Sequence, residues 1–123
     1  MQLYWRPRTA AFAADAALGE IDVPYERILV ERDSVGNVPE DYLRINPMGQ
    51  VPTLIDDSLV LPEVAAMLLY LADRYPEARL APASRAHFYR WLAFLTKTFL
   101  PALMRHFCPE RFGTEGVGSA ADG

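Results

Sequence analysis

The order of the first three predicted elements constrains the fold more than any other feature of this sequence. Residues 2–5 are rich in aromatic side chains and stop before Pro7, which predicts a strand. Apolar residues then recur at helical spacing behind Thr9, with Gly19 near the expected helix end, and residues 25–31 predict a second strand. A strand, a helix and a strand in this order require a parallel pair with a right-handed crossover.

Two short apolar segments further along the chain predict a β-hairpin. Residues 51–55 and 59–61 are separated only by the tight polar turn 56–58. Residues 39–43 predict one helical turn before the hairpin, and Pro62 suits the first position of a helix after it. A hairpin beside the parallel pair gives a four-stranded mixed sheet flanked by helices. We therefore predict an α/β fold with the thioredoxin-like arrangement.

The last third of the chain predicts a single long helix rather than more sheet. Residues 76–83 contain two prolines and predict a linker, after which Ser84 can cap a helix. Pro101 should kink or end this helix, and the glycine-rich residues 113–123 are expected to be disordered. The apolar stripe of the helix follows i, i+3, i+4, i+7 and i+11 spacing, at Phe88, Trp91, Leu92, Leu95 and Phe99.

Charge and cysteine content exclude several classes of function. The 12 basic and 16 acidic side chains give a net charge of −4, so no nucleic-acid-binding surface is expected, because phosphate binding needs clustered cations. No apolar run approaches the ~18 residues of a membrane span, so no membrane partner is expected. The single cysteine, Cys108, excludes an intrachain disulfide and a CxxC motif, and we expect no metal. These features predict a cytoplasmic protein.

Three segments, taken together, resemble the N-terminal domain of cytosolic glutathione S-transferases. They are Asn46-Pro47-Met48-Gly49-Gln50-Val51-Pro52-Thr53-Leu54, then Leu61-Pro62-Glu63, then Leu69-Tyr70-Leu71-Ala72-Asp73-Arg74-Tyr75-Pro76. The start of the chain, Leu3-Tyr4-Trp5-Arg6-Pro7, also fits the family. The resemblance covers roughly residues 1–80 closely. Residues 85–112 resemble the first helix of the family's all-helical second domain.

The resemblance implies a division of the chain into three parts. Residues 1–79 would form a thioredoxin-like glutathione-binding domain, and residues 80–112 a linker and the first helix of a shortened helical domain. Residues 113–123 would be a disordered tail. In the family, the pocket for the electrophile lies between the two domains, so a short helical domain leaves this pocket incomplete.

The turn before the third strand carries the first set of candidate glutathione-binding residues. The resemblance implies a cis peptide bond before Pro52, which turns the Val51 backbone N–H and C=O outward to pair with the cysteinyl part of glutathione. It also implies that Gln50 reaches the backbone or a carboxylate of the ligand. Without the resemblance, Pro52 is a trans proline at the start of a strand and Gln50 is a surface turn residue.

The start of the next helix carries the second set. The resemblance implies that Glu63 pairs with the γ-glutamyl amino group of glutathione. The family often has a serine at the following position, whereas this chain has Val64, whose backbone N–H at the helix start can still bind the γ-glutamyl carboxylate. The missing hydroxyl removes a hydrogen bond worth ~0.5–3 kcal/mol, so weaker binding is expected. The alternative for Glu63 is a solvated acid favoured by the helix dipole.

The catalytic position departs most from the family. Transfer needs a thiolate, and a free thiol has a pKa near ~8.5 that a hydroxyl donor or a helix N-terminus lowers. Relatives place a Tyr, Ser or Cys at or just before the first helix, where this chain has Ala10-Ala11. Thr9 is the nearest hydroxyl and is the candidate catalytic residue. The alternative is that Thr9 only caps the helix.

The resemblance implies a glutathione transferase that binds glutathione as co-substrate and transfers its thiolate to an electrophilic small molecule. It also implies a homodimer, formed through the helix after residue 62 and the last helix. The alternative is a non-catalytic binding or interaction module on the same fold, because the electrophile site is incomplete. A glutaredoxin-like thiol oxidoreductase is disfavoured, since residues 5–8 carry no cysteine.

Overall fold

The computed structural model describes residues 1–113, and its first part is built on a mixed sheet of four strands. These are β1 (Gln2–Trp5), β2 (Glu26–Leu29), β3 (Thr53–Asp56) and β4 (Leu59–Pro62), in the spatial order β2-β1-β3-β4. β1 pairs parallel with β2 and antiparallel with β3, and β3 pairs antiparallel with β4. The predicted α/β fold with a thioredoxin-like sheet is therefore confirmed.

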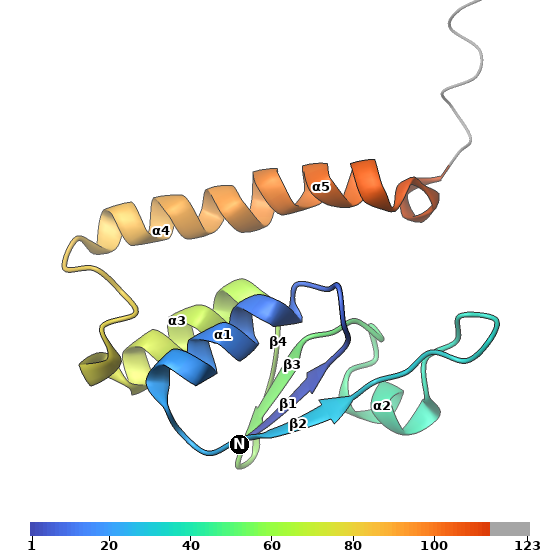
Figure 1. Ribbon diagram of the computed structural model, residues 1–123, viewed down its shortest axis with the longest axis horizontal. Coiled ribbons are helices and arrows are strands. Elements are labelled where there is room, and N and C mark those ends of the chain that lie inside the picture. Colours follow the sequence, from blue (N-terminus) through green and yellow to red (C-terminus); the bar gives the residue numbers. More distant parts are fainter. Residues whose placement is uncertain (114–123) are drawn as a thin grey trace, which may run out of the picture. The chain divides into compact units, whose positions relative to one another are not determined.

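Two helices, α1 (Ala11–Ile21) and α3 (Val64–Arg74), lie side by side against the sheet (Figure 1). The buried residues of α1 are three alanines and Leu18, so most of its inner side consists of small side chains. A hydrophobic core fills the layer between the helices and the strands. Its buried members are Leu3, Ala14, Ala17, Leu18, Leu54, Met67 and Leu71.

A third helix, α2 (Glu40–Ile45), packs against the opposite face of the sheet. Successive side chains of a strand point to opposite faces, so Tyr4 points away from the core that contains Leu3. The ring of Tyr42, on α2, lies 5.4 Å from the ring of Tyr4, measured between centroids. α2 is thereby fixed to the sheet next to the end of β1.

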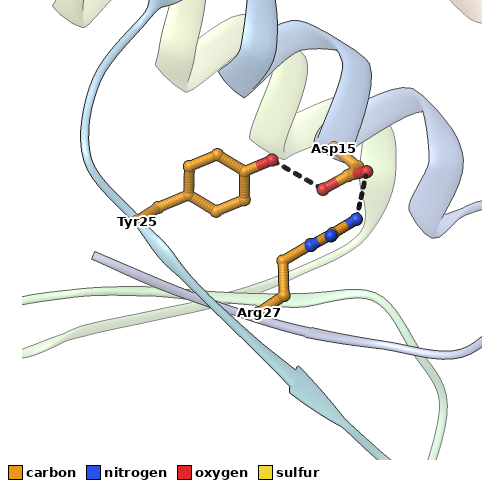
Figure 2. Close-up of polar contacts among 3 residues, drawn as sticks. All are labelled: Asp15, Tyr25 and Arg27. Atoms are coloured by element: carbon orange, nitrogen blue, oxygen red, sulfur yellow. Dashed lines mark hydrogen bonds and ion pairs between the residues drawn. The ribbon is translucent and has the colours of Figure 1, made fainter.

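Two clusters of charged and phenolic groups fix the helices to the strands. Figure 2 shows the first, in which the Tyr25 hydroxyl donates to Asp15 of α1 at 2.7 Å and Arg27 of β2 approaches the other carboxylate oxygen at 3.3 Å. Burial and the hydrogen bond to Asp15 raise the pKa of Tyr25. In the second cluster the buried Asp56 accepts from the Tyr70 hydroxyl at 2.6 Å and forms an ion pair with Arg74, whose Nε lies 3.1 Å away, which joins β3 to α3.

Three helix boundaries differ from the sequence prediction. The N-cap of α1 is Ala10, one residue after Thr9, and α1 continues past Gly19 to a left-handed C-cap at Asp22. Pro62 is not the first residue of a helix but the last of β4, because Glu63 with φ of 73° turns the chain before α3 begins. The positive φ at Glu63 prevents the helix from starting earlier.

The second part of the chain is helical. α4 (Arg85–Ala93) is followed by a π-helical segment (Phe94–Phe99) and by α5 (Leu100–Phe107). Pro101 was expected to kink or end the helix, but it lies near the start of α5, which continues to Phe107. The widened turn in front of Pro101 changes the hydrogen-bond pattern where the proline lacks an N–H.

Short 3₁₀ helices occur at Pro76–Ala78 and Pro109–Phe112. The chain forms two compact units, one of residues 1–83 and one that begins at Ser84. The expected domain division at residue 79 stays a prediction, because compactness alone does not define a domain. Apart from residue 113, the predicted disordered tail lies outside the described residues. None of the helices described here has the length and apolar character needed to cross a bilayer.

Candidate functional site

The strand register brings the predicted site segments to one end of the sheet. Thr53, the first residue of β3, pairs with Pro62, the last residue of β4, and with Tyr4 near the end of β1. The segment before Thr53, the segment after Pro62 and the loop after β1 therefore leave the sheet at the same end. Val51, Glu63 and Thr9 belong to these three segments.

The turn before β3 contains the predicted cis bond, between Val51 and Pro52. Pro52 is buried and Val51 is half-buried, while the Gln50 side chain is exposed. Neither backbone polar group of Val51 forms a hydrogen bond within the part of the chain that the structure describes. These two groups are therefore available to a bound extended peptide.

A buried polar network lies directly behind this turn. The Gln50 carbonyl oxygen accepts from the Tyr42 hydroxyl and, at 2.9 Å, from the Asn46 side-chain amide. Both side chains also reach the Thr53 hydroxyl, at 2.8 Å from the Tyr42 oxygen and 3.2 Å from the Asn46 nitrogen. Sequence reasoning missed Tyr42 and Asn46 as candidates. The sequence did contain one signal for them. Tyr42 precedes Asn46 by four residues, which is about one turn of a helix, so their side chains can lie on the same side.

Glu63 and Val64 mark the start of α3. Glu63 is exposed and has φ of 73° and ψ of 110°, a strained conformation for a residue with a side chain. Its carbonyl accepts from the Met67 N–H at 3.0 Å, so it already belongs to the helix hydrogen-bond pattern. No side chain caps this helix end. The first N–H groups of α3, beginning with Val64, can therefore meet an anion beside the Glu63 carboxylate.

The Thr9 hydroxyl already has partners. It donates to the Arg6 carbonyl oxygen at 2.6 Å and accepts from the Ala11 N–H at 3.3 Å. A hydroxyl has one proton, so Thr9 can donate to a sulfur atom only after it releases Arg6. The next N–H groups, of Phe12 and Ala13, make bonds of 3.3 and 3.2 Å to carbonyls three residues earlier. The catalytic role of Thr9 stays a prediction.

The groups at this end of the sheet suit recognition of a peptide. Within residues 1–113, no three His, Cys, Asp or Glu side chains form a group that could hold a metal ion. The end of the sheet offers a free peptide edge, a carboxylate and a helix N-terminus. These three groups can pair with a peptide backbone, an amino group and a carboxylate respectively.

Comparison with known proteins gives the same family for sequence and structure. The sequence model for the N-terminal domain of glutathione S-transferase matches residues 1–73. Glutathione S-transferase GST-4.5 of Xanthomonas campestris is 35% identical over 105 residues, which are 82% of this chain and 50% of that protein. Glutathione S-transferase GstB of Escherichia coli is 41% identical over 86 residues, which are 66% of this chain and 41% of that protein.

Two solved structures are similar over most of the described chain. The glutathione S-transferase of a sphingomonad, complexed with glutathione, has a TM-score of 0.76 and 36% identity, and the match covers 89% of this chain and 57% of that one. A glutathione transferase homologue from Sulfitobacter with bound glutathione has a TM-score of 0.82 and 30% identity, with 94% and 57% covered.

The chain spans about half the length of these relatives. The matched part includes the whole sheet and α1, α2 and nearly all of α3, which form the end of the sheet where Val51 and Glu63 lie. Because the family's own sequence model matches residues 1–73, more than half of its length, the chain belongs to the glutathione S-transferase family.

Proposed function

We propose that the chain binds reduced glutathione at the shared end of β3 and β4 and transfers its thiolate to an electrophilic small molecule. The observation that carries this proposal is the pairing of Thr53 with Pro62, which brings the free backbone of Val51 and the Glu63 carboxylate to one end of the sheet. Glutathione is an extended peptide with a free amino group and two carboxylates. The Val51 backbone, the Glu63 carboxylate and the start of α3 complement the peptide, the amino group and one carboxylate respectively. We assign the second carboxylate to the Gln50 side chain.

In this proposal each residue of the site has one role. The Val51 N–H and C=O pair with the cysteinyl residue, and Pro52 keeps that edge turned outward. Glu63 accepts from the γ-glutamyl ammonium group, and the Val64 N–H at the start of α3 donates to the γ-glutamyl carboxylate. The exposed Gln50 side chain reaches the backbone or the glycine carboxylate of the ligand.

The transfer step requires the glutathione thiol to lose its proton to solvent. The thiolate sulfur then forms a bond to the electrophilic carbon as the leaving group departs with its electron pair. Thr9 stabilises the thiolate by turning its hydroxyl from the Arg6 carbonyl to the sulfur, while it continues to accept from the Ala11 N–H. Thr9→Val should lower kcat/KM, and Thr9→Ser should retain most of it.

Homodimerisation and a cytoplasmic location complete the proposal. Large apolar side chains of the second unit are exposed, with Trp91 at 54% and Phe99 at 48%, and a second copy that contacts this helix and α3 would cover them. The lone cysteine, which forms no disulfide within the chain, suits a reducing compartment such as the cytoplasm.

Calorimetric titration with reduced glutathione tests the binding site. The unmodified chain should show saturable binding to one site. Glu63→Gln should raise the Kd by about 10- to 100-fold, because a hydrogen bond to a charged group is worth about 1.5–3 kcal/mol. The exposed Glu77→Gln is the matched control and should leave the Kd unchanged. No detectable binding at millimolar glutathione would overturn the proposal.

Two further measurements sharpen the assignment. Val64→Ser supplies the hydroxyl that the family often has, so it should lower the Kd by a few-fold. Chlorodinitrobenzene tests turnover, since addition of the sulfur to the ring expels chloride. Glutathione binding without any conjugation would favour the non-catalytic binding module over the transferase.

A further inference from the structure

The carbonyl oxygen of Gln50 is held from inside the protein by two side chains. The Tyr42 hydroxyl and the Asn46 amide nitrogen both donate to it, and the side chains of both residues are nearly inaccessible, with 4% exposure for each residue. A carbonyl oxygen has two lone pairs, so this acceptor is fully used. The direction of this carbonyl group is therefore fixed from the interior of the first unit.

The same peptide unit contains the N–H of Val51. A trans peptide unit is planar and its N–H points opposite to its C=O, and the cis bond of this turn is the next one, between Val51 and Pro52. Two donors that hold the Gln50 carbonyl inward thus direct the Val51 N–H away from the interior. This N–H has no partner among residues 1–113.

We infer that Tyr42 and Asn46 are positioning residues that set the direction of the Val51 N–H for a bound peptide. The inference rests on the proposed function, in which this N–H pairs with the cysteinyl residue of glutathione. Neither side chain needs to touch the ligand. They act through the Gln50–Val51 peptide unit, whose rotation would misalign the hydrogen bond to the ligand.

Other contacts hold the two positioning residues in place. The Asn46 side-chain oxygen accepts from the Met48 N–H at 3.1 Å, and the Asn46 N–H donates to the Tyr42 carbonyl at 2.9 Å. The Tyr42 ring packs against Tyr4, and Thr53 contacts the polar atoms of both side chains. The donors are thus preorganised before any ligand arrives.

Tyr42→Phe tests the inference, because it removes one donor and keeps the ring against Tyr4. Tyr70→Phe is the matched control, since it also removes a tyrosine hydroxyl that makes a short hydrogen bond in the same unit, to Asp56. Two quantities are measured in the full chain: the Kd of glutathione by calorimetry, and the residual dipolar coupling of the Val51 N–H by NMR, which reports its direction. Asn46→Asp is a second variant, which keeps the acceptor for Met48 and replaces the donor with an oxygen.

Tyr42→Phe should raise the Kd about fivefold to tenfold and change the Val51 coupling, whereas Tyr70→Phe should leave both unchanged. Asn46→Asp should have a larger effect in the same direction. An unchanged Kd and coupling in Tyr42→Phe and Asn46→Asp would overturn the inference, as would an equal rise of the Kd in Tyr70→Phe. If the unmodified chain binds no glutathione, the proposed function fails. The Val51 coupling in the variants then still decides whether these residues orient the N–H.

Discussion

The two compact units of this chain bury their apolar side chains to very different extents. In the first unit Leu3, Leu18, Leu54, Met67 and Leu71 are completely inaccessible to solvent. In the second, no residue from 84 to 113 is buried, and most of its aromatic side chains are exposed. The first unit therefore has a buried interior of its own, whereas residues 84–113 have none.

Polar contacts follow the same division. Asp15 and Asp56 of the first unit each join a helix to the sheet through a tyrosine hydroxyl and an arginine. In the second unit, by contrast, the Thr96 hydroxyl donates to the carbonyl of Leu92, four residues earlier in the same helical stretch. Long-range contacts specify a fold and local ones only support a helix, so the candidate site belongs to the unit that specifies its own geometry.

Truncating one leucine in each unit should have the largest effect on stability, and it tests the difference in burial between the two units. Leu18→Ala opens a cavity in the core, so it should lower the free energy of unfolding by about 2–5 kcal/mol. Leu103→Ala, at a side chain that is 37% exposed, should cost less than about 1 kcal/mol. Urea unfolding measures both. Equal losses would mean that the second unit has a buried core of its own.

Asp56→Asn tests the polar contacts of the first unit. The change leaves the Tyr70 hydroxyl and the Arg74 guanidinium facing a neutral amide, so it should destabilise the protein by about 1–3 kcal/mol. Glu40→Gln breaks the exposed ion pair with Arg44, at 3.0 Å, and should cost about 0.5 kcal/mol or less. A similar cost for the two variants in urea unfolding would contradict the distinction between buried and exposed carboxylates.

Phe99→Ser tests the exposed face of the second unit. If a second copy covers this face, removing a half-exposed aromatic ring should weaken self-association about tenfold, with little change in the unfolding of the first unit. Sedimentation velocity over a range of protein concentrations measures the association. Thr98→Ser, an exposed position on the same turn, is the control. A chain that stays monomeric at every concentration would exclude the homodimer.

The smallest effect is expected from alkaline pH. The hydrogen bond to Asp56 raises the pKa of Tyr70, and burial, followed by the bond to Asp15, raises that of Tyr25. A tyrosine whose pKa is raised in the folded state contributes stability at any pH below its ordinary pKa of about 10. This contribution is lost as the pH rises through the raised pKa of the folded state. Tyrosinate absorbance should show a component that titrates late, and Tyr70→Phe should reduce this component. Titration of all tyrosines together near their ordinary pKa would contradict this expectation.

The arrangement of the sheet could be predicted from sequence because its signals are local. The polar segment 56–58 predicts the hairpin, whose turn is Asp57-Ser58, and the order of strand and helix fixes the crossover. The start of α3 was predicted wrongly, since a proline is equally at home at the first helical position and at the end of a strand, and only the φ of Glu63 decides. Such a dihedral angle depends on tertiary packing.

The candidate site was predictable only in part for a related reason. The cis bond before Pro52 was inferred from a resemblance and is confirmed, since residue type alone favours trans. Tyr42 was missed because a tyrosine on a short helix is more often a packing residue. Its role depends on a contact with Gln50 that forms only when α2 folds back on the turn. The competition between Arg6 and a sulfur for the Thr9 proton is likewise visible only in three dimensions.

The backbone conformation of Glu63 has a consequence for how this chain responds to selection. A glycine would adopt a φ of 73° without steric cost but would carry no carboxylate, so Glu63→Gly should be close to neutral or stabilising while it removes the proposed ligand contact. Glu63→Gln keeps the strain and loses only the charge. A library screened for thermal stability should therefore enrich glycine at position 63, and one screened for glutathione affinity should retain the acid.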